Sequence, residues 1–306
     1  MLRAVLAFVR LSRLKFLSGG LVGGAFGTAI SHAVGARFDV VAYALAQLTI
    51  TAFHLMTHYA NDYFDRAVDV RSVRTPYSGG SGALVDGSLS PRVALVAAGA
   101  CASVGFAGAI ALALAAHAPI AAWIAVAIGA LAWTYSAPPL RLLARGLGEL
   151  DTALVVAVLV PLCAFAAQRP HLGGFGIALA STLPGAAAIF AMMLAVEYPD
   201  LASDAVGEKR NLVVRAGPSR GCAYGIAAVV LTYVAVGIAM ATGAPPALGF
   251  VEATSVPLGI GLARRFAARA ASADGCDDEA LAGCGVAFFF IVSLDALLAY
   301  LAGLRA

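Results

Sequence analysis

Charged side chains are scarce in this sequence. Asp, Glu, Lys and Arg make up 12% of its 306 residues, about half the share found in a typical soluble domain. Hydrophobic residues make up 61%, and the mean hydropathy is +0.89. This composition excludes a soluble single domain, and the small net charge of +3 gives no indication of nucleic-acid binding.

Cysteine is also sparse, with five residues and no CxxC pair. Three of the five lie in apolar runs, where cysteine behaves as a small hydrophobic residue. The sequence therefore favours neither a disulfide framework nor a zinc site.

Long apolar runs are abundant, and a membrane-spanning helix needs about 20 such residues. We expect an all-α, polytopic membrane protein with about nine transmembrane helices. The expected spans are residues 16–36, 40–60, 92–115, 119–135, 150–167, 174–197, 221–242, 246–263 and 284–303.

Basic residues separate sharply between the two sides that nine spans would create. The N-terminus and the loops after the second, fourth, sixth and eighth spans hold 17 of the 20 Lys and Arg residues. The positive-inside rule places that side in the cytoplasm. We expect an integral protein of the cytoplasmic membrane, with its N-terminus and its polar loops facing the cytoplasm.

The N-terminal segment is basic and amphipathic. Arg10, Arg13 and Lys15 interrupt its apolar residues, and no small-residue cleavage site follows, which argues against a signal peptide. We expect residues 1–15 to form a surface helix on the membrane. Residues 16–306 then form a single transmembrane domain.

A cluster of acidic residues ends the second span. Asp62, Asp65 and Asp69 follow Asn61 at a spacing that places them on one helical face. Like charges on one face repel unless a cation lies among them, and oxygen ligands of this kind suit Mg²⁺.

A second cluster ends the sixth span. Glu197, Asp200 and Asp204 repeat the same spacing, and Lys209 and Arg210 follow closely. Carboxylates beside cations, twice on the same side of the membrane, indicate a diphosphate bridged by Mg²⁺. One such cluster alone is equally explained as a solvated helix end; the pair favours a binding site.

These motifs resemble those of the UbiA superfamily of intramembrane prenyltransferases. The pattern Asn61-Asp62-x-x-Asp65-x-x-x-Asp69 resembles the family's first aspartate motif, and Asp200-x-x-x-Asp204 resembles the second. The segment 135–149 resembles the family's loop after the fourth span, and the segment 200–217 is similar to the branch that prenylates 1,4-dihydroxy-2-naphthoate for menaquinone. The short gap from Asp65 to Asp69 is that of hydroxybenzoate-type enzymes, which keeps 4-hydroxybenzoate or another acceptor open.

The resemblance implies a fold, an activity and a set of site residues. The fold would be a ring of two four-helix halves plus one helix. The activity would be Mg²⁺-dependent transfer of a prenyl group from a prenyl diphosphate to an aromatic acceptor within membrane lipids, with no nucleic-acid partner. It implies catalytic roles for Asp65, Asp200 and Lys209. The implied metal ligands are Asn61, Asp62, Asp65, Asp69, Asp200 and Asp204. The implied residues for the diphosphate and its cap are Arg66, Arg71, Arg74, Tyr135, Ser136, Arg141 and Arg210.

Other polar features have simpler interpretations. The glycine-rich segment 76–82 is either a plain turn or a cap over the site. His54 and His58 imitate a metal pair but favour packing or support of neighbouring ligands. Asp274, Asp277, Asp278 and Glu279 favour a solvated helix start. Asp295 and Glu252 lie in apolar runs without a partner that the sequence identifies.

One alternative of a different class is a secondary transporter that couples cations to an anionic substrate. It predicts acidic residues near the middle of the membrane rather than at cytoplasmic helix ends.

Overall fold

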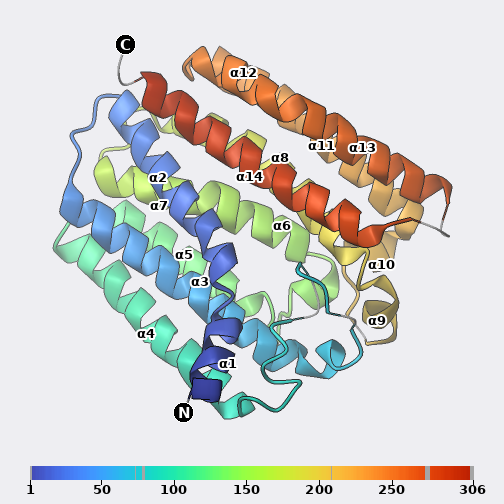
Figure 1. The fold of residues 1–306 in the computed structure, drawn as a ribbon. Helices are drawn as coiled ribbons and strands as arrows, with labels where there is room; N and C mark the ends of the chain where they lie inside the picture. Colours follow the sequence, from blue (N-terminus) through green and yellow to red (C-terminus); the bar gives the residue numbers. More distant parts are fainter. Residues whose placement is uncertain (1, 73, 78–79, 208, 273–275, 304–306) are drawn as a thin grey trace.

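The computed structural model of the chain is all-helical and describes residues 2–72, 74–77, 80–207, 209–272 and 276–303 (Figure 1). Ser78 and Gly79 of the glycine-rich segment lie outside the described residues, as does Arg305 of the basic-residue pattern.

The N-terminal helix α1 (Leu2–Ser12) turns through η1 (Leu14–Phe16) into α2 (Leu17–Ala33). Ala7 and Leu11 are buried, whereas the side chain of Arg10 is 42% exposed. Helix α1 packs on α3, where the hydroxyls of Ser12 and Tyr59 lie 2.8 Å apart. The helix is therefore amphipathic, as the sequence predicts; its place on the membrane surface stays a prediction.

The next helices form the first half of the bundle: α3 (Val40–Asp69), α4 (Pro91–Leu114) and α5 (Pro119–Thr134). Asp39 caps α3 by accepting hydrogen bonds from the backbone of Val41 and Ala42, and Ser90 caps α4 ahead of Pro91. The span that follows is irregular: α6 (Gly148–Thr152), a π-helical stretch η3 (Ala153–Leu159) and α7 (Val160–Gln168). A short 3₁₀ turn, η2 (Leu143–Arg145), precedes it.

The second half begins with α8 (Phe175–Glu197) and continues through the short helices α9 (Leu201–Val206) and α10 (Leu212–Ala216) into α11 (Pro218–Ala241). The next span is broken into α12 (Ala247–Glu252), the 3₁₀ turn η4 (Ala253–Ser255) and α13 (Val256–Ala271). Helix α14 (Asp278–Gly303) is the last.

The helices contact one another in a closed ring. Within the first half, α3 packs on α4 and α4 on α5; within the second, α8 packs on α11, α11 on α13 and α13 on α14. The π-helical stretch η3 joins α8 on one side, and α2 closes the ring by packing on both α3 and α14. Helices α1, α9 and α10 lie at one end of this ring, and the last turns of α14 lie at the other (Figure 1).

The helices follow the predicted spans closely. Six described helical segments are long and apolar enough to cross a membrane, and the shorter α5 is apolar as well. The prediction of an all-helical, polytopic membrane protein is confirmed; the count of nine spans stays a prediction. Helix α3 runs nine residues past its expected end at residue 60, so the first acidic cluster is helical throughout.

Candidate active site

The first acidic cluster occupies the last turns of α3. The amide of Asn61 donates hydrogen bonds to Asp65 (2.7 Å) and to the hydroxyl of Ser136 (2.9 Å). Asp65 is 6% exposed. The Asn61 amide therefore fixes the position of the Asp65 carboxylate by a hydrogen bond between successive turns of one helix.

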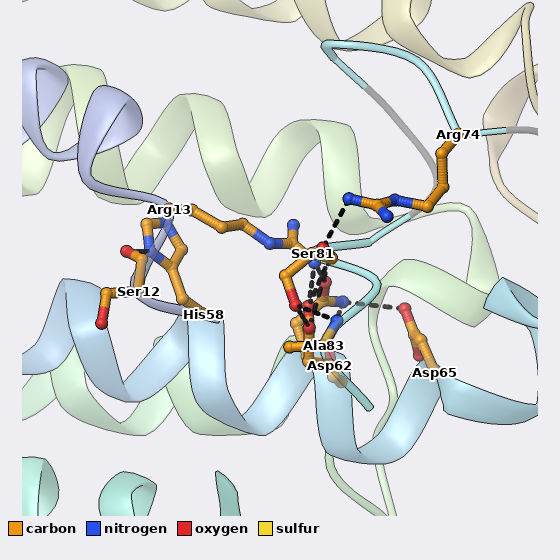
Figure 2. Close-up of polar contacts among 10 residues, drawn as sticks. Ser12, Arg13, His58, Asp62, Asp65, Arg74, Ser81 and Ala83 are labelled. Carbon is orange, nitrogen blue, oxygen red and sulfur yellow. Dashed lines mark hydrogen bonds and ion pairs between the residues drawn. The ribbon is translucent and has the colours of Figure 1, made fainter. Parts of the chain in front are cut away.

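Asp62 points to a different set of partners. Its carboxylate accepts hydrogen bonds from the backbone N–H and the hydroxyl of Ser81, and it forms an ion pair with Arg13 (Figure 2). The guanidinium of Arg74 donates to the carbonyl of Ser81 at 2.6 Å. Asp62 thus ties the loop after α3 and the turn after α1 to the end of α3.

The second acidic cluster lies at the end of α8 and on α9. Asn211 donates to Oδ2 of Asp204 at 2.8 Å, and Nζ of Lys209 lies 3.6 Å from Oδ1 of the same residue. Burial raises the pKa of Asp204 to about 6, against the opposing effect of Lys209. Burial alone would lower the pKa of Lys209, but Asp65 and Asp204 outweigh it and raise that pKa above its usual value.

Both clusters line one cavity of about 630 Å³. Its lining changes in character along each helix that borders it. On α3 it runs from Ile50 and Phe53 to Asp65 and Asp69. On α8 it runs from Ile189 and Met192 to Glu197, with Asp200 just beyond. One end of the cavity is therefore polar and the other is hydrocarbon. Because α3 and α8 approach the cavity from opposite halves of the ring, the two clusters face each other across it.

The structure brings most of the predicted site residues to this cavity. Those that line it are Asn61, Asp65, Asp69, Arg74, Tyr135, Asp200, Asp204 and Lys209. Ser136 is buried behind Asn61, to which it is hydrogen-bonded. Asp62, Arg66, Arg71, Arg141 and Arg210 are not among the described lining residues, and Arg66, Arg71 and Arg210 are exposed. Roles for these residues stay predictions.

The cavity is also lined by three residues that the sequence analysis does not include among the individual site residues. Arg13 and Lys15 reach it from the turn after α1, and Ser81 from the loop after α3. Lys15 donates to the carbonyl of Pro76, which joins the same two segments. The basic character of residues 10–15 was visible, but nothing in the sequence indicates that this turn folds back onto Asp62.

A buried glutamate links the polar end to the following loops. Glu149 is fully buried, and its Oε1 accepts a hydrogen bond of 2.6 Å from the backbone of Leu212. The segment carrying Lys209 is further held by the backbone hydrogen bond from Arg210 to Ala144. These bonds attach the second cluster to the start of α6.

The donor set suits a hard cation held jointly with a phosphate ligand. In the part of the chain that the structure describes, no group of three or more His, Cys, Asp or Glu side chains could hold a metal alone. Mg²⁺ is commonly held by one or two carboxylates together with substrate phosphate oxygens and water. Asp65, Asp69, Asp200 and Asp204 offer oxygen ligands of that kind from two sides, with Asn61 beside them.

His54 and His58 line the cavity beside the first acidic cluster. Their rings lie 4.7 Å apart, and a ring nitrogen of His58 is 2.9 Å from the carbonyl of Ser12; a packing role for the pair stays a prediction. At the start of α14, Asp277 accepts from the backbone of Ala280, and Asp278 pairs with Arg269 at 2.8 Å. Asp274 lies outside the described residues.

Solved structures with the same arrangement of helices are homologues of UbiA. A UbiA homologue from Archaeoglobus fulgidus, bound to GPP and Mg²⁺, has a TM-score of 0.70 at 15% identity, over 97% of this chain and 100% of that one. An apo UbiA homologue from Aeropyrum pernix K1 has a TM-score of 0.64 at 17% identity, over 94% and 98%. A digeranylgeranylglyceryl phosphate synthase has a TM-score of 0.66 at 16% identity, over 98% of each chain.

Comparison with curated protein sequences gives no match. The family comparison is decisive, because residues 20–294, nearly the whole chain, match one family. The chain belongs to the UbiA prenyltransferase family and is an enzyme of the prenyltransferase class.

Proposed function

We propose that this protein transfers a prenyl group from a prenyl diphosphate to an aromatic acceptor in the cytoplasmic membrane, with Mg²⁺ at the polar end of the cavity. The observation that carries the proposal is the cavity itself. It joins carboxylates and cations at one end to an apolar arm at the other, which matches a diphosphate with a hydrocarbon tail.

In this proposal, different side chains bind the metal, the diphosphate and the hydrocarbon tail. Asp65, Asp69, Asp200 and Asp204 hold Mg²⁺, and Lys209, Arg74 and Arg13 bind the diphosphate oxygens. When bound, Mg²⁺ neutralises the diphosphate and stabilises pyrophosphate as the leaving group. The apolar side chains of α3, η3, α8 and α14 hold the tail.

Water must be kept from the allylic cation that forms as pyrophosphate departs. The loop after α3 and the turn after α1 lie over the polar end, joined through Asp62, Arg13 and Ser81. We assign to these two segments the exclusion of water. Solved UbiA homologues from Archaeoglobus fulgidus with GPP or DMAPP and Mg²⁺ support the donor class.

For the acceptor, we favour a 1,4-dihydroxy-2-naphthoate-like aromatic, with 4-hydroxybenzoate as the alternative. Segment 200–217 supports the first, and the short spacing of Asp65 and Asp69 supports the second.

The test is product analysis with purified protein in lipid nanodiscs. The protein receives DMAPP, GPP and longer prenyl diphosphates with each aromatic acid, with Mg²⁺ or with EDTA. We expect pyrophosphate release and a prenylated aromatic, seen by mass spectrometry, only with Mg²⁺. Turnover that EDTA leaves unchanged contradicts the metal assignment. Protein that binds none of the prenyl diphosphates contradicts the assignment of the donor class.

A further inference from the structure

One carboxylate in the cavity wall belongs to neither acidic cluster. Asp151 lies on α6, one turn inside the start of the segment 148–168, and is 8% exposed. Its Oδ1 has no hydrogen-bond partner, and its carboxylate forms no ion pair within the described residues. Lys209, one of the cations that line the cavity, pairs with Asp204 instead.

Asp151 lies where the cavity lining changes from polar to apolar. Along its own span the lining residues continue as Thr152, Val155, Val156 and Val160, so only the first turn is polar. On α3 the lining changes from polar to apolar between His54 and Phe53, and on α8 it changes between Glu197 and Val196. A donor with its diphosphate at the polar end and its tail in the apolar arm places its reacting carbon, C1, at this boundary.

The partner that Asp151 lacks cannot come from the donor substrate. A prenyl diphosphate has no hydrogen-bond donor at C1 or along its tail, and a buried carboxylate is unfavourable unless a donor satisfies it. A hydroxyl on the aromatic ring that attacks C1 is such a donor, and it must lie at the same boundary.

We propose that Asp151 binds the hydroxyl of a hydroxyaromatic acceptor and takes up its proton during transfer; this inference rests on the proposed function. As the C1–O bond breaks, its electron pair leaves with pyrophosphate, and the ring carbon supplies the pair for the new C–C bond. Asp151 holds the hydroxyl proton through this step. It returns that proton to the oxygen when the ring carbon loses its own proton to the departing pyrophosphate. The products are the prenylated aromatic and pyrophosphate, which carries the released proton.

The assignment predicts that substitution of Asp151 slows prenyl transfer but does not weaken binding of the donor. In Asp151→Asn the amide keeps a hydrogen-bond acceptor but cannot take up the proton. We expect the kcat for transfer to fall about 100-fold or more, the scale of a lost general base, while the Kd for GPP with Mg²⁺ stays within about twofold. Asp151→Glu should recover part of the lost rate.

The matched control is Asp295→Asn. Asp295 is 7% exposed, as buried as Asp151, and also lies within a span, but it is hydrogen-bonded to Thr254 and is not among the described lining residues. Its substitution should leave both transfer and GPP binding unchanged. Thermal unfolding of each variant in nanodiscs shows whether the fold is retained.

A second readout uses the acceptor. We expect an acceptor whose hydroxyl is replaced by a methoxy group to react far more slowly than the hydroxyl form with the native enzyme, and equally slowly with the native enzyme and Asp151→Asn. Near-native transfer by Asp151→Asn overturns the inference. So does a variant that loses GPP binding or folding along with transfer, because that result assigns Asp151 a structural role.

The failure of this inference is distinct from failure of the proposed function. Native protein that neither binds GPP with Mg²⁺ nor releases pyrophosphate contradicts the function itself. Native protein that transfers normally, beside an Asp151→Asn variant that does the same, contradicts only the role of Asp151.

Discussion

The carboxylates of the two acidic clusters differ in kind from the acids elsewhere in the chain. Replacing Asp65, Asp200 or Asp204 by Ala should cost at least about 3 kcal/mol of transition-state stabilisation, the scale of losing one electrostatic stabiliser. The measurement is kcat/KM for prenyl transfer with saturating Mg²⁺. We expect each variant to remain folded, because removing one of several facing carboxylates relieves repulsion.

Asp277 provides the control for that series. It accepts a hydrogen bond of 2.8 Å from the backbone of Ala280 at the start of α14, so its replacement by Ala should cost about 1 kcal/mol of stability and no activity. A loss of activity in Asp277→Ala equal to that in Asp65→Ala would remove the distinction between site and helix cap.

Arg13 makes contacts in the structure that the sequence does not predict. Its guanidinium contacts both Asp62 and Asn61, and its side chain is 20% exposed. Arg13→Ala should weaken binding of a prenyl diphosphate by about tenfold or more, since a hydrogen bond to a charged group contributes about 1.5–3 kcal/mol. Isothermal titration with GPP and Mg²⁺ measures this.

Arg10 is the comparison for Arg13, three residues away on the same segment. Its ion pair with Asp86 is exposed on both sides, and such pairs contribute about 0–1 kcal/mol. Arg10 also lines the cavity, but its charge is paired with Asp86, so Arg10→Ala should weaken binding far less than Arg13→Ala. Equal losses for the two variants would indicate a general charge effect rather than a specific contact of Arg13.

Local spacing accounts for what the sequence predicted of the site. Asn61, Asp65, Asp69, Asp200 and Asp204 are recognisable because a helix places residues three and four apart on one face. Contacts made by segments far apart in the chain are not encoded in this way. Arg13 and Asp62 are separated by 49 residues, and their pairing depends on how α1 folds back across α3.

Among the elements, the spans were predictable because their apolar runs match the thickness of a bilayer. The exact ends of the helices were less predictable. Helix α3 continues through the acidic cluster to Asp69, since charged residues beyond the apolar run of a helix need no apolar surroundings. The π-helical stretch η3 leaves no hydropathy signal, because residues 153–159 are all apolar. The break between α12 and α13 spans only Ala253–Ser255, which is too short to divide the apolar run around it.

Glycine sets the closest approach between elements. A Cβ on Gly27 of α2 would overlap the backbone of Pro161 on α7. Small residues at helix contacts allow this proximity within membranes. Gly27→Ala should destabilise the protein by about 1–3 kcal/mol, the usual cost of overpacking, seen as a lower unfolding midpoint in nanodiscs.

Gly99 on α4 is the matched control. A Cβ there meets no heavy atom within 4 Å, so Gly99→Ala should be neutral or stabilising by up to about 1 kcal/mol, the difference in helix propensity. A destabilised Gly99→Ala beside an unaffected Gly27→Ala would contradict the packing assigned to α2 and α7.

For the whole molecule, the one-sided distribution of Lys and Arg predicts its orientation. Ser219 and Thr242 are exposed residues at the two ends of the long helix α11. In a variant without native cysteines, a membrane-impermeant maleimide should label Thr242→Cys in spheroplasts. It should label Ser219→Cys only in inverted vesicles. The reverse pattern would place the cavity's polar end outside the cytoplasm.

The facing carboxylates have a consequence for how long the protein survives in a cell. Without ligand, their repulsion opposes folding. A donor that binds only the folded state at 100 times its Kd would add about 2.7 kcal/mol of stability. Marginal stability governs how often a chain is exposed to proteases. The supply of prenyl diphosphate should therefore govern the abundance of this enzyme as well as its rate, so that cells short of the precursor also lose the protein that consumes it.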